Sequence, residues 1–375
     1  MPSVVHITTV HSPFDNRIFH RECKTLSEAG YEVSLIAAHE RDETVEGIRI
    51  CSFKRPDGRF ARMTLGVWRA LRVAMRQGGR IYHFHDPEFI PAALVLRLLG
   101  KRIIYDIHED NSTALLEREY LPRALRSFIA RALSACERLA TRPFRQVLAE
   151  RYYAERFPRG HTVLNYARLP DIDESLLRER PYAGGVRLLY TGNVKDYRGG
   201  FHHVRILHNM PDAEVFLVGR CDRALAEQLH QAAGTEKARL HLEGIGHYVA
   251  HERIIDHYLR ERWTAALAVF PPGRHTLRKE LTKIFEYMVY GLPVICSDFP
   301  NLRCIVAEND CGLCVNPEDD EAVAEAVRYL SEHPEQAERL GNNGRRAARA
   351  HFHWGIQAEK LLALYGDLTS RYKLS

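Results

Sequence analysis

Short β-forming runs alternate with helix-length segments along most of this chain. Within residues 1–165 the runs are SVVHITTV, YEVSLIAA, IRICSF, RIYHFH, KRIIYDIH, QVLAE and HTVLN. They are apolar on both faces, which is typical of strands covered on both sides by helices. Because right-handed helical crossovers between such strands give a parallel sheet, the pattern predicts an α/β domain.

The alternation stops once and then begins again. Residues 166–185 lack it and carry two prolines, which indicates a connector. The second series is VRLLYTG, AEVFLVG, RLHLEG, AALAVF, PVICS and GLCV, and the sequence is strongly helical from about Asp319 onward. A chain of 375 residues is also too long for one ordinary core. We therefore expect two Rossmann-like doubly wound parallel-sheet domains, at residues 1–168 and 184–351.

Composition narrows the class of protein. Apolar residues make up 45% and charged residues 27%, with both signs mixed, as in a soluble globular enzyme. No secretory signal or spanning apolar stretch is visible. The eight cysteines lie mostly in apolar runs and indicate reduced structural thiols, although Cys311 and Cys314 have the spacing of half a zinc site. We expect a cytoplasmic protein.

The formal net charge of +5 is unevenly distributed. Residues 54–80 carry eight basic residues against the single acid Asp57. A second basic stretch contains Arg123, Arg126, Arg131, Arg138, Arg142 and Arg145, with Leu121, Leu125, Phe128, Ile129 and Leu133 at helical spacing. This pairing suits anionic lipid headgroups at the inner face of the plasma membrane, and an ordinary solvated helix face is the alternative. No nucleic-acid-binding motif accompanies the charge, so we expect no nucleic-acid partner.

Polar residues follow the first strand of the second series, where a doubly wound sheet places its ligand. The segment runs from Thr191 to Gly200 and includes Gly192, Asn193, Lys195 and Arg198. Glycines let the backbone approach an oxyanion, the next helix offers free N–H groups, and the two cations can neutralise a diphosphate. Gly219 follows the next strand and is assigned to the same donor-binding site.

The segment from Leu281 to Pro300 is more specific. Thr282 is predicted as the N-cap of a helix that stops at Gly291 and leads into the buried strand PVICS. Glu286 lies four residues after Thr282, on the same side of the helix, where its carboxylate can accept hydrogen bonds from two vicinal ribose hydroxyls. Lys283, between them, is counted with the donor-binding residues.

Histidines and carboxylates gather at strand ends in the first domain. His83, His85 and Asp86 end one run, and His108, Glu109 and Asp110 end the next. Such pairs on neighbouring strands can converge on zinc or iron. The alternative assigns them to hydrogen bonding on the acceptor side of a transfer site.

The segment TKIFEYMVYGLPVICSDFP resembles the C-terminal donor-binding motif of glycosyltransferase family 4, retaining enzymes of the GT-B fold. The resemblance covers nearly the whole chain, through HSPFDNRIFHRECKTLSEAGYEV, YHFHDPE, YDIHE, YTGNVKDYRGG, AEVFLVG, CGLCVNPEDDEAVAEAV and a closing W-x-x-x-AEKLLALY. In this order the motifs are similar to a branch of the family found in bacterial surface-polysaccharide clusters.

The resemblance implies two domains facing across a cleft, with a last helix, residues 352–375, that packs back on the first domain. It implies that Glu286 binds the donor ribose, that Lys195 and Arg198 hold the diphosphate and stabilise the leaving nucleotide, and that His108 lines the reaction centre. The substrates would be a nucleoside-diphosphate sugar and a lipid-linked or saccharide acceptor, with no metal or cofactor. The acceptor-side residues would be Arg17, His85, Asp86, His108 and Glu109.

Two departures from the family pattern bear on this assignment. The first of the family's two glutamates would fall at Arg278, so Glu280, or the backbone around Leu281 and Thr282, would take over its contacts to the sugar. The glycine-rich loop after the first strand is replaced by His11–Arg17. There, Arg17 either reaches the diphosphate or an acidic acceptor, or pairs with Asp15.

Three other classes of protein remain open from the sequence. A non-hydrolysing nucleotide-sugar epimerase shares the fold and the donor site. A metal-dependent hydrolase would use His83, His85 and His108. A catalytically silent, membrane-attached binding protein would bind nucleotide or polysaccharide without turnover.

Overall fold

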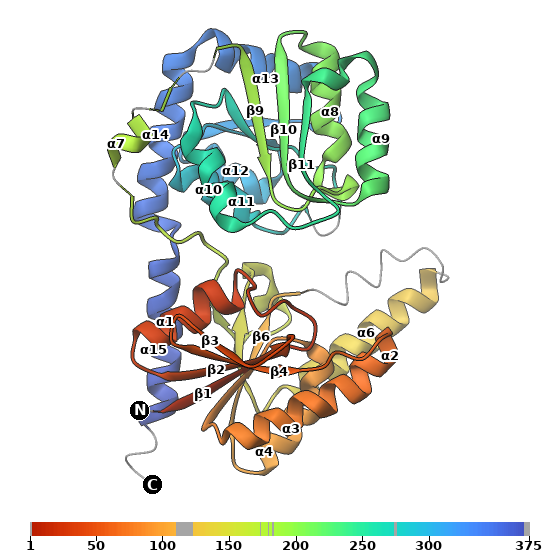
Figure 1. Ribbon diagram of the computed structural model, residues 1–375, viewed down its shortest axis with the longest axis vertical. Coiled ribbons are helices and arrows are strands. Elements are labelled where there is room, and N and C mark those ends of the chain that lie inside the picture. The colour runs from red at the N-terminus through yellow and green to blue at the C-terminus, as the bar shows by residue number, and fades with distance from the viewer. Residues whose placement is uncertain are drawn as a thin grey trace. The chain divides into compact units, whose positions relative to one another are not determined.

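The computed structural model describes residues 2–109, 123–172, 174–178, 180–181, 184–273 and 276–370. The chain divides into two compact units (Figure 1). Unit 1 comprises Met1–Asn165 and Trp354–Ser375, and unit 2 comprises Tyr166–His353. Asp110 and Leu121 lie outside the described residues, as do the side chains of Arg123, Leu125 and Arg126.

Unit 1 is built on one eight-stranded sheet with the order β3-β4-β2-β1-β5-β6-β7-β8. Its strands are β1 (Ser3–Ile7), β2 (Glu32–Ala38), β3 (Glu43–Val45), β4 (Ile48–Phe53), β5 (Ile81–Phe84), β6 (Arg102–Ile107), β7 (Arg145–Leu148) and β8 (His161–Thr162). Seven of them match the runs expected from the sequence. The edge strand β3 was missed because it has only three residues and no buried side chain; it pairs antiparallel with β4.

Helices cover both faces of this sheet, and each face carries its own apolar cluster. The helices are α1 (Lys24–Glu28), α2 (Arg59–Ala61), α3 (Val67–Gln77), α4 (Ile90–Leu98), α6 (Arg123–Ala140) and α15 (Trp354–Ser370). The last helix belongs to this unit although it closes the chain. Trp354 and Leu361 pack in the cluster that contains Val4 and Leu35, and the Trp354 indole N–H donates to Thr25 Oγ1 at 2.8 Å.

Unit 2 is built on six parallel strands with the order β11-β10-β9-β12-β13-β14. The strands are β9 (Val186–Thr191), β10 (Ala213–Cys221), β11 (Leu240–Ile245), β12 (Ala265–Ala268), β13 (Val294–Ser297) and β14 (Gly312–Val315). The helices are α7 (Glu174–Arg178), α8 (Gly200–Asn209), α9 (Arg223–Ala233), α10 (His251–Arg260), α11 (Thr282–Val289), α12 (Pro300–Val306), α13 (Asp320–Glu332) and α14 (Pro334–His351). This strand order is that of a Rossmann sheet, whose order reverses between β9 and β12.

The prediction of two parallel-sheet α/β domains is therefore confirmed. The eight cysteines are free thiols. Cys296 and Cys314 are register partners on β13 and β14, with their sulfurs 3.6 Å apart. Among the described helices, we find no candidate with the length and apolar character needed to cross a bilayer.

Candidate functional site

In unit 2, glycines allow the carboxyl ends of β9 and β10 to approach each other closely. Gly192 and Gly219 have φ angles of +102° and +148°, which residues other than glycine rarely adopt. A Cβ atom on Gly219 would lie 2.2 Å from the carbonyl oxygen of Gly192. The Gly192 N–H donates to Val218 O at 2.8 Å, so the chain leaves the sheet while still held by its neighbour.

A third glycine sets the start of α8. Gly199 has a φ of +81°, and a Cβ atom there would lie 1.9 Å from the carbonyl oxygen of Val269, just beyond β12. Glycine thus brings the N-terminus of α8 to the point where the strand order reverses. This geometry supports the sequence-based reading of the loop, because helix N-termini present N–H groups that favour anions.

Helix α11 contributes a buried lysine to the same region. Lys283 Nζ donates to Thr191 O at 2.8 Å and lies 3.4 Å from the centre of the Tyr190 ring. Burial lowers the pKa of Lys283 well below its usual value, the charge of Arg198 lowers it further, and Glu286 raises it. Lys283 therefore lies within electrostatic reach of both Arg198 and Glu286.

Glu286 faces two hydroxyl groups of unit 2. The Tyr258 hydroxyl donates to Glu286 Oε2 at 3.2 Å, and the Tyr258 and Thr191 hydroxyl oxygens are 2.7 Å apart. In α11, Thr282 and Glu286 are half-buried, whereas the other six residues are buried, so the two share one side of the helix as expected. Through Tyr258, the carboxylate is therefore linked to Thr191, the last residue of β9.

The predicted N-cap role of Thr282 is wrong. Thr282 is the first residue of α11, and the N-cap is Leu281, which has φ −77° and ψ 109° and makes no side-chain cap. Thr282 could be the N-cap only if the helix began at Lys283, but the helix begins one residue earlier. The other end is as predicted: Gly291 has φ +64° and its N–H donates to Met288 O at 3.0 Å.

The two cations of the loop after β9 have different partners. Lys195 forms an ion pair with Asp222, which directly follows β10. Burial raises the pKa of the Tyr190 hydroxyl, and the charge of Arg198, together with a hydrogen bond from it, counteracts that rise. Asn193 contributes its carbonyl oxygen, which accepts from the Tyr190 hydroxyl at 2.9 Å. Arg198 and Lys283 thus both lie at Tyr190, whereas Lys195 is held by an acid.

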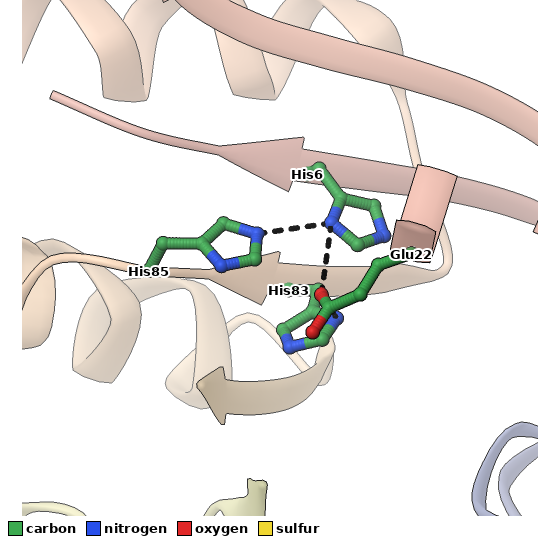
Figure 2. Close-up of side chains that lie close together, drawn as sticks. All are labelled: His6, Glu22, His83 and His85. Atoms are coloured by element: carbon green, nitrogen blue, oxygen red, sulfur yellow. Dashed lines mark hydrogen bonds and ion pairs between the residues drawn. The ribbon is translucent and has the colours of Figure 1, made fainter. Parts of the chain in front are cut away.

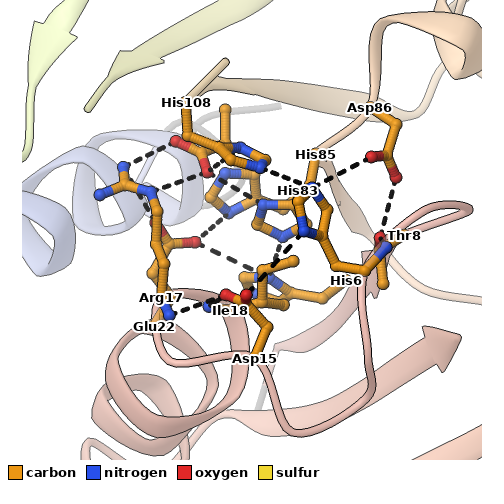
Figure 3. Close-up of polar contacts among 12 residues, drawn as sticks. His6, Thr8, Asp15, Arg17, Ile18, Glu22, His83, His85, Asp86 and His108 are labelled. Atoms are coloured by element: carbon orange, nitrogen blue, oxygen red, sulfur yellow. Dashed lines mark hydrogen bonds and ion pairs between the residues drawn. The ribbon is translucent and has the colours of Figure 1, made fainter. Parts of the chain in front are cut away.

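In unit 1, Asp106 is the centre of a buried polar network at the carboxyl ends of β1, β5 and β6. Its partners Arg17, His85 and His108 are labelled in Figure 3. Its Oδ2 lies 2.9 Å from Arg17 Nε, 3.0 Å from His85 Nδ1 and 3.1 Å from His108 Nδ1, and its Oδ1 accepts from Arg17 Nη2 at 2.7 Å. Although burial raises it, the pKa of Asp106 is lowered well below its usual value by these partners, led by the charge of Arg17.

Arg17 is occupied by the protein itself. Besides Asp106, its guanidinium donates to Val163 O at 3.0 Å and to Asn165 Oδ1 at 2.7 Å, and it lies 3.2 Å from Glu22 Oε1. The residue is only 5% exposed. The donors of Arg17 thus point inward, and its side chain pairs with Asp106 and Glu22 and not with Asp15. Asp15 Oδ1 instead accepts backbone N–H groups, including that of Arg17 at 2.8 Å.

His108 links this network to the surface. Its Nε2 lies 2.9 Å from His11 Nε2, and Glu109 Oε1 lies 3.8 Å from the same His11 nitrogen. Burial lowers the pKa of His108, but the hydrogen bond and charge of Asp106 outweigh this and raise the pKa to about 9. Below that pH the imidazole carries a positive charge at the carboxyl end of β6.

Asp86 holds the residues that lead from β1 into the segment His11–Arg17. Its Oδ2 accepts from the Thr8 hydroxyl at 2.8 Å and from the Thr9 N–H at 2.6 Å, and the Val10 N–H follows at 3.3 Å. Asp86 Oδ1 lies 3.4 Å from His11 Nε2. A carboxylate thus satisfies backbone N–H groups that would otherwise be free after β1.

Behind His85 lies a second group of fully buried side chains, namely His6, Glu22 and His83 (Figure 2). His6 Nδ1 is 3.0 Å from His85 Nε2, and His83 Nδ1 is 2.9 Å from the Tyr365 hydroxyl. Burial keeps the pKa of His6 and of His83 well below the usual value, so both imidazoles are neutral at physiological pH.

The metal alternative required His83, His85 and His108 to act together. Their potential ligand atoms fall into different groups: His83 and His85 lie with His6 and Glu22, and His108 lies either with His85 and Asp106 or with His11 and Glu109. Within the part of the chain that the structure describes, no group combines the three histidines.

Sequence reasoning missed Asp106, Glu22, His6 and Tyr365. His6 and Asp106 are polar residues inside the apolar runs SVVHI and RIIYDI, and an interrupted run of this kind was the available signal. Glu22 and Tyr365 lie on helical segments, where nothing marked them as buried. Their roles depend on which residues the sheet brings together.

Known proteins match this chain in both units. The family described as Glycosyltransferase Family 4 matches residues 16–156, and the family described as Glycosyl transferases group 1 matches residues 187–347. A phosphatidyl-myo-inositol mannosyltransferase of Mycolicibacterium smegmatis is 23% identical over 359 residues, which cover 91% of this chain and 87% of that protein.

Two solved structures resemble the whole chain. Sucrose-phosphate synthase from Thermosynechococcus elongatus superposes with a TM-score of 0.77 at 18% identity, covering 99% of this chain and 100% of that one. Anabaena HepE in complex with UDP-glucose superposes with a TM-score of 0.71 at 10% identity, covering 97% and 99%. The fold and the matched regions together define a glycosyltransferase with the GT-B architecture. More narrowly, the chain belongs to glycosyltransferase family 4.

Proposed function

We propose that this glycosyltransferase moves a hexosyl group from a nucleoside-diphosphate sugar to an acceptor hydroxyl, with retention at the anomeric carbon and without a metal ion. The acceptor is a lipid-linked glycan of surface-polysaccharide biosynthesis. The observation that carries the proposal is the arrangement at the glycine-lined end of β9, where Lys283 Nζ donates to Thr191 O at 2.8 Å and lies near Gly192. Tyr258 links Thr191 to the carboxylate of Glu286, and Arg198 lies at the Tyr190 hydroxyl. A pyrophosphate and a ribose need this combination of cations, open backbone and one carboxylate.

The donor roles follow from the charges that develop in the reaction. Cleavage of the glycosyl–phosphate bond leaves negative charge on the diphosphate, and cations fixed at that position stabilise it. Arg198 supplies a permanent charge there. Lys195 joins it when the diphosphate displaces Asp222, and a bound diphosphate also favours the protonated form of Lys283.

On the acceptor side, we assign His108 to the reaction centre, with Glu109 beside it. The positive charge that Asp106 maintains on His108 suits an electrostatic contact to the sugar or to the diphosphate. Arg17 and His85 act through Asp106 as positioning residues, and Asp86 positions the loop that carries His11.

Glu286→Gln is expected to weaken binding of the cognate nucleoside diphosphate about ten- to a hundredfold and to suppress transfer, because an amide replaces the charged acceptor of the ribose hydroxyls. A thermal-shift screen of nucleoside diphosphates identifies the base first, since a ligand that binds only the folded state raises the melting temperature. Titration calorimetry then compares the variant with Glu325→Gln, an exposed glutamate on α13. Equal affinity in the two variants would remove Glu286 from the donor site.

The membrane part of the proposal depends on one surface of unit 1, formed by the turns from Arg59 to Gln77. Phe60 and Trp68 are 82% and 56% exposed there, next to the exposed cations Arg72 and Arg76. Exposed aromatic and basic side chains on one helical segment suit an anionic interface.

Arg72→Gln/Arg76→Gln is expected to reduce co-sedimentation with phosphatidylglycerol vesicles several-fold, because each basic residue near an anionic surface contributes about 1 kcal/mol. Transfer to a soluble acceptor should be unchanged. Arg328→Gln/Arg339→Gln in unit 2 is the control of equal charge. Wild-type partitioning of the unit 1 variant would discard the membrane surface.

The other classes predict different products. An epimerase converts the donor when no acceptor is present, so product analysis with donor alone separates it from a transferase. A metal-dependent hydrolase loses activity with chelators, whereas the proposed transferase does not.

A further inference from the structure

A pocket of about 830 Å³ lies in unit 1 at the amino ends of β6 and β7. Arg102 and Arg145, the first residues of those strands, line it. His108 follows the opposite end of β6, and a strand of this length spans about 20 Å at ~3.3 Å per residue. The pocket is therefore separate from the candidate acceptor site.

Positive charge dominates this pocket. The described residues that line it include eight lysines and arginines and no acid: Arg97, Lys101, Arg102, Arg138, Arg142, Arg145, Arg156 and Arg159. Arg156 pairs with Glu137 at 3.0 Å, but no acid within the described part of the chain pairs with Arg138 or Arg142, which are both exposed. Like charges gathered in one concavity repel each other unless an anion compensates them.

Favourable interaction with helix dipoles explains only part of this cluster of cations. Cations near the C-terminus of α6 interact favourably with the helix dipole, which accounts for Arg138 and Arg142. Arg97 lies in the last turn of α4, whose dipole accounts for it in the same way. Arg145 comes from β7 and Arg159 from the loop before β8, so no helix dipole accounts for these two. Several elements that are distant in sequence supply cations to one volume.

The pocket also has a built apolar floor. Phe144 and Phe157 line it and are 6% and 2% exposed, and the Arg156 guanidinium lies 4.7 Å from the centre of the Phe157 ring. Guanidinium groups bind phosphate oxygens in bidentate geometry, and a stacked guanidinium is held in place for such contacts. The volume falls in the range of small-molecule sites.

We propose that this pocket binds a phosphorylated ligand with several phosphate oxygens, at a site distinct from sugar transfer. The same chemistry is present in a soluble phosphorylated metabolite and in a lipid headgroup. The protein would thereby sense or anchor to a phosphate-bearing compound while its carboxyl-end site carries out the reaction.

Tripolyphosphate is the probe for this site. Titration calorimetry on the full chain is expected to show binding that weakens about tenfold in Arg138→Gln/Arg142→Gln, because two charged contacts of the ligand are lost. Arg72→Gln/Arg76→Gln, with the same charge change on α3, is the matched control and should bind as the wild type does. Circular dichroism on each variant checks the fold.

The two sources of phosphate are separated by competition. Displacement of tripolyphosphate by phosphatidylglycerol vesicles identifies a lipid headgroup, and retention in their presence identifies a soluble ligand; either result supports the site. An equal loss of affinity in the control variant, or no saturable binding by the wild type, would overturn the proposal.

Discussion

Arg198→Ala is expected to lower the rate of sugar transfer about a hundredfold or more, since removal of one preorganised charge contact to a transition state costs about 3 kcal/mol. We assign Arg198 this large effect because it lies with Lys283 at Tyr190, near the end of β9. The measurement is kcat with saturating donor and acceptor.

A control and a comparison sharpen this experiment. Arg220→Ala removes an arginine that is 43% exposed near the end of β10, where its guanidinium stacks on Tyr248, and should retain the wild-type rate. Lys195→Ala should lower the rate less than Arg198→Ala, because Lys195 must first leave Asp222. A wild-type rate in Arg198→Ala would remove the proposed diphosphate contact.

Arg17→Met is expected to destabilise the protein by about 3–5 kcal/mol, the usual cost of removing one partner of a buried ion pair. The change removes the charge that does most to keep the buried Asp106 carboxylate ionised in the core of unit 1. Denaturant unfolding, followed by a probe in unit 1, measures the effect. The network beneath His108 should lose its geometry at the same time.

Two further variants test the physical reason. Arg49→Met removes an exposed ion pair with Glu32 and should cost at most about 1 kcal/mol. Arg17→Met combined with Asp106→Asn should recover part of the lost stability, because no unpaired charge then remains at position 106. If Arg17→Met alone unfolds as the wild type does, the network does not support unit 1.

Local sequence patterns predicted the sheets because a buried parallel strand needs a continuous apolar run, and that requirement is visible in a few neighbouring residues. The edge strand β3 was not predicted because its three residues are partly exposed and form no apolar run. The error at Thr282 has a similar origin, since a hydroxyl residue before an apolar helix fits either the N-cap or the first turn.

The sequence by itself determined the two series of strands, the glycines at their ends and the side of α11 on which Glu286 lies, because these depend on local periodicity and backbone freedom. Only the tertiary structure decided that Arg17 binds Asp106 and Glu22, that Lys195 pairs with Asp222, and that Lys283 is buried beside Arg198. These partners depend on which strands are neighbours in the sheet and on how deeply each side chain is buried. Neither the strand order nor the burial can be inferred from the residues adjacent in sequence.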